Sequence, residues 1–120
     1  MYSKKVIDHF QNPKNMGKMK NPDVMAEVGN PQCGDIMKFY LKIKDNVIKD
    51  ISFETMGCVA AISTSSMITE MAKGKTLDQA MKISYNDIAK ELGNLPPVKI
   101  HCANLAVEVL QKAINDYRGK

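Results

Sequence analysis

The residues of this chain best suited to chemistry are three cysteines and two neighbours. Cys33 is followed two residues later by Asp35, Cys58 precedes an apolar helix-forming segment, and Cys102 directly follows His101. Thiolates are nucleophiles and soft metal ligands, and a carboxylate or an imidazole can complete a set of four. Three thiols with either Asp35 or His101 would suit zinc or the two irons of a small iron–sulfur cluster. The residue types therefore predict a metal or sulfur site.

The positions of the cysteines favour thiolate chemistry but also allow a purely structural interpretation. Cys58 and Cys102 stand at the beginning of expected helices, where partly positive backbone N–H groups favour the thiolate. A cysteine on an apolar helix face is also a common buried small side chain, His101 could be an ordinary surface histidine, and Asp35 could bond its own turn. We interpret His9 as structural, because nothing near it in sequence marks it as a ligand. The cysteine intervals match no Cys-x-x-Cys pattern, so spacing alone leaves both interpretations open.

The first half of the chain predicts a short helix and three strands. Ser3 can cap a helix that runs to about Phe10, and Asn12–Gly17 forms a loop. A first strand is expected at 24–28, ended by the turn at 29–31 that leads to Cys33. Alternating apolar residues from Met37 to Lys44, the turn at 45–46 and the segment 47–55 predict an antiparallel hairpin.

The second half predicts helices. A helix is expected at 59–73, stopped by Gly74, followed by two short helices at 76–83 and 84–92. The two prolines at 96–97 require an extended segment. Helical periodicity from Cys102 to Tyr117 predicts a long amphipathic helix that covers the sheet. The expected fold class is α+β: a small antiparallel three-stranded sheet with helices packed on one face and a long C-terminal helix.

Composition places the chain among small globular proteins. The 120 residues fit one domain, 1–120, and no stretch approaches the apolar length of a membrane span. The N-terminal residues do not have the pattern of a signal or transit peptide, so we expect a cytoplasmic protein whose odd number of cysteines does not form a disulfide framework. The net charge of +4 comes from scattered lysines and one arginine, which argues against nucleic acid as a partner.

Four motifs occur together in this chain: Lys5–Gly17, Cys33-Gly34-Asp35, Gly57-Cys58 before a Ser/Thr-rich helix, and Leu95-Pro96-Pro97-Val98-Lys99-Ile100-His101-Cys102. Together they resemble the IscU/NifU N-terminal family of iron–sulfur cluster assembly scaffolds. The similarity runs nearly end to end, and the last motif is long and specific.

The resemblance implies a scaffold rather than an enzyme. Cys33, Cys58 and Cys102 would accept persulfide sulfur and hold a nascent, labile [2Fe–2S] cluster made from iron and desulfurase-derived sulfur, which then passes to apo-proteins. Asp35 and His101 would compete as the fourth ligand, and zinc would occupy the metal-binding residues of the apo form. A carboxylate or imidazole in place of a fourth thiolate makes a cluster easier to release, which suits a scaffold.

The resemblance also implies partners. These are a cysteine desulfurase, a ferredoxin-like electron donor, apo iron–sulfur proteins, and an Hsp70-type chaperone with its co-chaperone. The chaperone would bind Leu95, Pro96, Pro97, Val98 and Lys99, an extended stretch suited to a groove. Homo-oligomers are a further expectation, with 1–17 as an N-terminal arm that stays mobile until a partner or second subunit orders it.

Two alternatives remain at this point. The SufU branch of the same superfamily is a zinc-dependent sulfur acceptor, a sulfurtransferase partner of the desulfurase, with a similar Cys/Asp set. That branch generally lacks a histidine before the third cysteine and has an insertion between the second and third, whereas His101 is present here and the interval is compact. The other alternative is a structural or regulatory zinc domain without sulfur chemistry, which does not account for the whole motif set.

Overall fold

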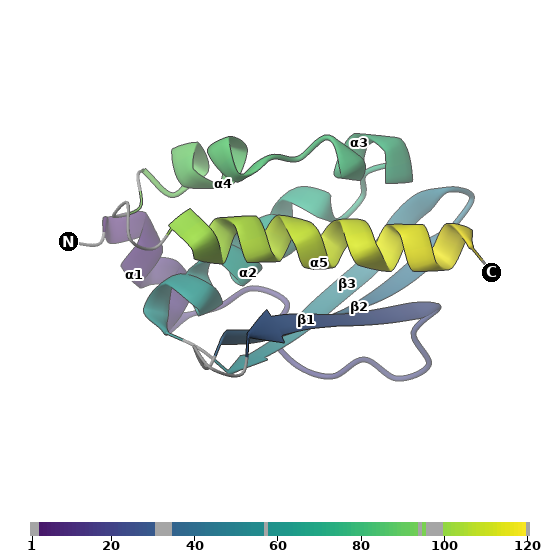
Figure 1. Cartoon of the computed structure of the whole chain (residues 1–120), viewed down its shortest axis with the longest axis horizontal. Coiled ribbons are helices and arrows are strands. Elements are labelled where there is room, and N and C mark those ends of the chain that lie inside the picture. The colour runs from purple at the N-terminus through teal and green to yellow at the C-terminus, as the bar shows by residue number, and fades with distance from the viewer. Residues whose placement is uncertain (1–2, 31–34, 57, 94, 96–99, 120) are drawn as a thin grey trace.

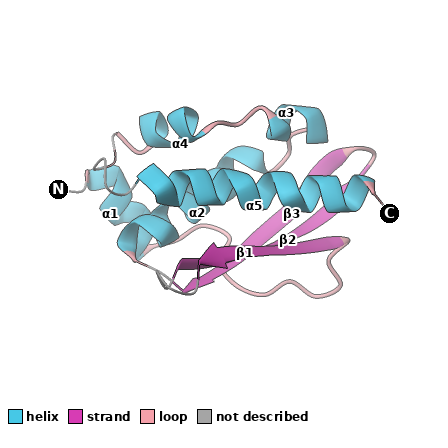
Figure 2. Cartoon of the chain, viewed as in Figure 1, coloured by secondary structure: helices cyan, strands magenta, loops and turns pink. Residues whose placement is uncertain are grey.

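The computed structural model describes residues 3–30, 35–56, 58–93, 95 and 100–119. Strands β1 (Val24–Asn30), β2 (Asp35–Lys44) and β3 (Val47–Met56) form an antiparallel sheet in the order β1-β2-β3. The long helices α2 (Val59–Ala72) and α5 (Ile100–Arg118) lie against one face of the sheet, as Figures 1 and 2 show. The expected fold class is confirmed.

The predicted hairpin is confirmed, with longer strands than expected. Met37, Phe39 and Leu41 are fully buried on one face of β2. Asp45 and Asn46 both have positive φ, 54° and 63°, the two-residue turn geometry whose twist suits a hairpin. The sequence places the start of β2 two residues too late.

The expected end of the first strand at residue 28 is wrong. Gly29 and Asn30 remain in β1, because their backbones pair with Ile36 and Asp35 of β2. The turn expected at 29–31 therefore begins too early, because the partner strand extends the ladder through Gly29 and Asn30. The chain between Asn30 and Asp35, which includes Cys33, therefore begins and ends at one end of the sheet.

The outer edge of β3 is occupied by two loops. The N–H of Phe53 donates to the carbonyl of Asn15 at 2.9 Å, and Gly17 donates back to Phe53 at 2.8 Å. Further along the strand, Gly74 donates to the carbonyl of Ile48 at 2.8 Å. A strand edge left open invites pairing with other chains, so these loops protect it.

Helix α1 (Lys4–Gln11) begins at Ser3, whose hydroxyl caps it by accepting from the N–H of Val6. Val6 is fully buried, and its carbonyl accepts a 2.7 Å hydrogen bond from Ser63 of α2. Ser66 of α2 also accepts from the N–H of Lys14 at 2.8 Å. The buried hydroxyls of α2 thus bind the N-terminal segment; its mobility in solution stays a prediction.

The short helices α3 (Leu77–Met81) and α4 (Tyr85–Glu91) begin at Thr76 and Ser84 with complete capping boxes. Helix α3 ends two residues earlier than the sequence indicates. Helix α5 begins at Ile100, and its buried stripe runs from Cys102 to Ile114. In the described part of the chain, no helix is both long enough and apolar enough to cross a membrane.

Candidate functional site

Cys58 is the N-cap residue of α2, immediately after β3. Its backbone is extended, with φ −82° and ψ −177°, and its side chain makes no capping hydrogen bond to the helix. The side chain is half-buried. A sulfur at this position lies near the positive end of the α2 backbone dipoles, which stabilises a thiolate.

Cys102 approaches Cys58 from the first turn of α5. Its side chain is fully buried, and its Sγ atom lies 4.0 Å from Sγ of Cys58. This separation is about twice the length of an S–S bond, so the residues are neighbouring thiols rather than a disulfide. Contact between α2 and α5 therefore joins two cysteines that are 44 residues apart in sequence.

His101 lies beside this thiol pair. Its Nε2 atom is 3.5 Å from Sγ of Cys102, and the residue as a whole is exposed. Because His101 is exposed, its ring can turn toward a ligand without opening the core. The structure thus brings three of the five predicted site residues together.

The spacing of these atoms fits metal coordination. Two sulfurs on one tetrahedral metal ion lie about 3.8 Å apart, and a sulfur and an imidazole nitrogen about 3.6 Å apart. The observed 4.0 Å and 3.5 Å are close to these values. Among the described residues, however, no group of three or more Cys, His, Asp or Glu side chains could hold a metal ion. A complete ligand set therefore needs further residues.

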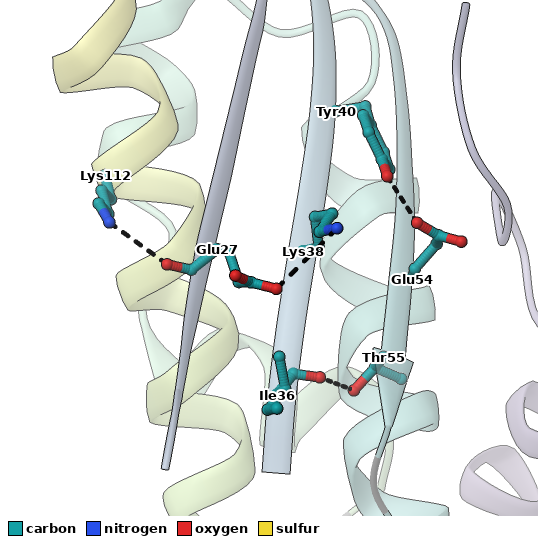
Figure 3. Close-up of polar contacts among 7 residues, drawn as sticks. All are labelled: Glu27, Ile36, Lys38, Tyr40, Glu54, Thr55 and Lys112. Carbon is teal, nitrogen blue, oxygen red and sulfur yellow. Dashed lines mark hydrogen bonds and ion pairs between the residues drawn. The ribbon is translucent and has the colours of Figure 1, made fainter. Parts of the chain in front are cut away.

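The sheet register identifies where further ligands can come from. Ile36 pairs with Met56, so the beginning of β2 lies beside the end of β3 that leads to Cys58. Thr55 strengthens this junction by donating a 2.6 Å hydrogen bond to the carbonyl of Ile36, as Figure 3 shows. The side chain of Asp35 and the whole of Cys33 lie outside the described residues, but the backbone of Asp35 is next to Ile36.

The sheet face opposite the helices carries polar pairs near this end. Tyr40 donates a 2.5 Å hydrogen bond to Glu54, and Lys38 lies 4.0 Å from Glu27 (Figure 3). The hydrogen bond to Glu54 is the main reason that the pKa of Tyr40 rises to about 12, with burial and nearby negative charge adding to it. Tyr40 is therefore a neutral hydrogen-bond donor at physiological pH.

An open groove of about 350 Å³ lies on the same face, with Ile36, Thr55 and Met56 among its lining residues. Met56 is 73 % exposed. The groove borders the strand ends that lead to Asp35 and Cys58. It leaves that end of the sheet accessible from outside.

Two further sequence predictions concern residues away from the thiol pair. Leu95 is only 8 % exposed, so a chaperone that bound its side chain would first have to displace it; residues 96–99 lie outside the described chain. His9 is 2.7 Å from Ser66 Oγ, in agreement with the structural interpretation.

Sequence reasoning missed Thr55 and Ser66, because a hydroxyl within a strand or helix gives no local sign of a partner far along the chain.

Fold and site together define a small α+β protein that holds two thiols at the junction of two helices, beside the end of a sheet. The chain belongs to the family of NifU-like N-terminal domains, which it matches over residues 1–120.

Curated relatives are similar over nearly the whole chain. The iron–sulfur cluster assembly scaffold protein IscU 1 of Archaeoglobus fulgidus is 59 % identical over 120 residues, covering 100 % of this chain and 78 % of the relative. The iron–sulfur cluster assembly scaffold protein IscU of Escherichia coli K12 is 50 % identical over 123 residues, covering 99 % of this chain and 95 % of the relative.

Solved structures share the fold. A NifU-like protein from Brucella abortus superimposes with a TM-score of 0.79 at 24 % identity. The match covers 98 % of this chain and 94 % of the Brucella chain. A scaffold candidate for the SUF system of Fervidobacterium islandicum AW-1 also gives 0.79, at 26 % identity, covering 94 % and 96 %. The first likeness supports the fold alone.

Proposed function

We propose that this chain is a scaffold on which a labile [2Fe–2S] cluster is assembled from iron and sulfur and then passed to apo-proteins. The observation that supports this most directly is the 4.0 Å approach of Cys58 and Cys102, at a spacing suited to one metal ion. The relatives named as IscU scaffolds at 50–59 % identity support it independently.

In this proposal Cys33, Cys58 and Cys102 hold the cluster, and Asp35 and His101 compete for the remaining position. Iron–sulfur clusters are held by cysteine thiolates, and histidine replaces them at one iron in some centres. A carboxylate is a harder ligand that binds soft clusters less tightly. A mixed set therefore suits a cluster that must leave.

The sulfur in this proposal comes from a cysteine desulfurase as a persulfide, with electrons from a ferredoxin-like protein. The half-buried thiol of Cys58 and the exposed ring of His101 give incoming reactants access to the thiol pair. A reducing cytoplasm would keep the thiols available. A chaperone with its co-chaperone would act through Leu95–Lys99 and would have to displace the buried side chain of Leu95.

The test is anaerobic reconstitution of metal-free protein with ferrous iron, cysteine and a cysteine desulfurase. Visible absorption and Mössbauer spectra would follow the cluster, and iron, sulfide and zinc would be quantified. We expect a [2Fe–2S] spectrum whose cluster transfers to an apo-ferredoxin. Retention of zinc with faster desulfurase turnover and no cluster would instead support the zinc-dependent sulfurtransferase.

Two variants make the reconstitution specific to the site. Cys102→Ser should abolish stable cluster assembly, because it removes one of the paired sulfurs. Ala103→Ser is the matched control, since Ala103 is the next residue of the same helical turn, equally buried, and both thiols remain. Equal cluster yield in the two variants would contradict the role of Cys102.

A further inference from the structure

The two thiols differ in access. Cys58 is half-buried at the N-cap of α2, while Cys102 is fully buried 4.0 Å behind it. A sulfur donor therefore reaches Cys58 first. Once Cys58 carries an extra sulfur atom, the nearest described thiol to its Sγ atom is that of Cys102.

We propose that Cys58 and Cys102 act together as a dithiol that releases sulfide from a persulfide formed on Cys58. This inference rests on the proposed function, which supplies the persulfide. In this proposal the thiol pair itself supplies the two electrons that convert sulfane sulfur into sulfide. An outside dithiol reductant is then needed only to restore the pair.

The chemistry balances in two steps. In the first, the Cys58 thiolate attacks the outer sulfur of a donor persulfide, and the donor leaves as a thiolate. In the second, the Cys102 sulfur attacks Sγ of Cys58, the S–S bond of the persulfide breaks, and the products are a Cys58–Cys102 disulfide and hydrogen sulfide. The two cysteine sulfurs lose one electron each, and the released sulfur gains both. A dithiol reductant returns the pair to its starting state.

The geometry favours this second step over reaction with an outside thiol. Reacting atoms in a productive complex lie about 3–3.5 Å apart, so the 4.0 Å separation needs only a small adjustment. The half-buried side chain at the N-cap can make it, because the Cys58 sulfur is not used to cap the helix. Hydrosulfide is also a better leaving group than an alkyl thiolate, since it is the weaker base. Because Cys102 is buried, its sulfur meets Cys58 more readily than it meets a thiol in solution.

The release of sulfide has a consequence for assembly. Sulfide would be produced at the two residues that bind the metal, rather than in solution. The disulfide that remains cannot bind iron through thiolates, so each release would have to be followed by reduction. Assembly would therefore proceed as alternating sulfur release and thiol reduction.

The experiment uses full-length protein, stripped of metal, without oxygen, iron or other thiols. Glutathione persulfide is added as the probe, and released sulfide and protein mass are measured together. The expected result is about one equivalent of sulfide per chain, a mass loss of two hydrogens, and a Cys58–Cys102 disulfide in peptide maps. A disulfide that involves Cys33 instead, or no sulfide above the background of the probe, would overturn the proposal.

Variants separate the two steps. Cys102→Ser should stop at a persulfide on Cys58, seen as the mass gain of one sulfur, with sulfide at background level. Ala103→Ser should release sulfide as the unchanged protein does. Sulfide release from Cys102→Ser as fast as from the unchanged protein, with a glutathione adduct on Cys58, would contradict the proposal, because it would mean that the probe or its glutathione product does the work assigned to Cys102.

The outcome is independent of the scaffold test. No iron is present, so sulfide release can succeed even if no cluster forms on reconstitution, in which case the proposed function fails and the dithiol chemistry stands. A normal cluster in reconstitution with no sulfide from the metal-free protein would refute the dithiol chemistry alone.

Discussion

Thr55 holds the end of β3 to the beginning of β2, because its hydroxyl donates a 2.6 Å hydrogen bond to the carbonyl of Ile36. The bond joins the strand that leads to Cys58 with the strand that begins at Asp35. We expect Thr55→Val to keep the side-chain shape and lower the free energy of unfolding by about 1 kcal/mol. Because the chain has no tryptophan, urea denaturation followed by circular dichroism measures this loss.

Ser52 is the matched control on the same strand. Within the described part of the chain its buried Oγ atom has no hydrogen-bond partner. Removing a buried hydroxyl that bonds nothing costs little, so Ser52→Ala should leave the unfolding free energy unchanged or slightly raised. An equal loss in both variants would show that the Thr55 hydrogen bond does not stabilise the junction.

Zinc should stabilise the folded protein through the thiol pair. A ligand that binds only the folded state raises the free energy of unfolding by about 2.7 kcal/mol at a free concentration one hundred times its dissociation constant. We expect excess zinc to raise the urea midpoint and a chelator to reverse the effect. Cobalt(II) in place of zinc should show a thiolate charge-transfer band.

The zinc effect should depend on sulfur at position 102. Cys102→Ser should lose most of the zinc-dependent rise in the urea midpoint, and its cobalt band should be weaker. Ala103→Ser should keep both the rise and the band. The gain is measured within each variant, so a change in the stability of the metal-free protein does not affect the comparison. A full gain in Cys102→Ser would mean that zinc binds elsewhere.

Sequence reasoning succeeds here where the signal is local. Alternation along Met37–Lys44 and periodicity along Cys102–Tyr117 record which side chains face the core, and the structure confirms both. Strand ends were missed because pairing with a partner strand decides them. The approach of Cys58 to Cys102 could not be derived from spacing, since it depends on how α5 packs on α2. Ligand chemistry only suggested grouping the cysteines, and the resemblance to a family supported that grouping.

Asp35 should control how readily a bound cluster leaves. A carboxylate is a weak ligand for a soft cluster, and its removal favours histidine or tighter enclosure. We expect Asp35→Ala to assemble a cluster that dissociates more slowly, by up to about tenfold, or ~1.4 kcal/mol in activation free energy. Decay of the visible absorption after addition of a chelator gives the rate. Faster decay in the variant would make Asp35 a stabilising ligand.

His9 links the N-terminal helix to α2 in a way that should depend on pH. Its Nδ1 atom lies 2.7 Å from Ser66 Oγ, which already accepts from the N–H of Lys14 at 2.8 Å. The hydroxyl proton of Ser66 is therefore available for Nδ1 of a neutral His9. Protonation of Nδ1 removes this acceptor and charges a ring whose burial disfavours the charged form, so we expect the contact between α1 and α2 to weaken in acid.

The pKa of His9 is lowered from its ordinary value, chiefly because burial disfavours the charged ring, with Lys14 adding to this and Glu70 and Asp8 opposing it. The unfolded chain then binds the proton more readily than the folded protein does. The stability due to neutral His9 is fully present above about pH 6.5, the unfolded value, and is lost as pH falls from there through the lowered folded pKa.

His9→Asn isolates this contribution. The amide oxygen can accept from Ser66 as Nδ1 does, but it does not titrate. Urea unfolding at pH 7.5 and pH 5.5 should therefore show a larger loss of stability in acid for the unchanged protein than for the variant. Identical losses would mean that the pH dependence of folding arises from other groups, and that the hydrogen bond between His9 and Ser66 survives protonation.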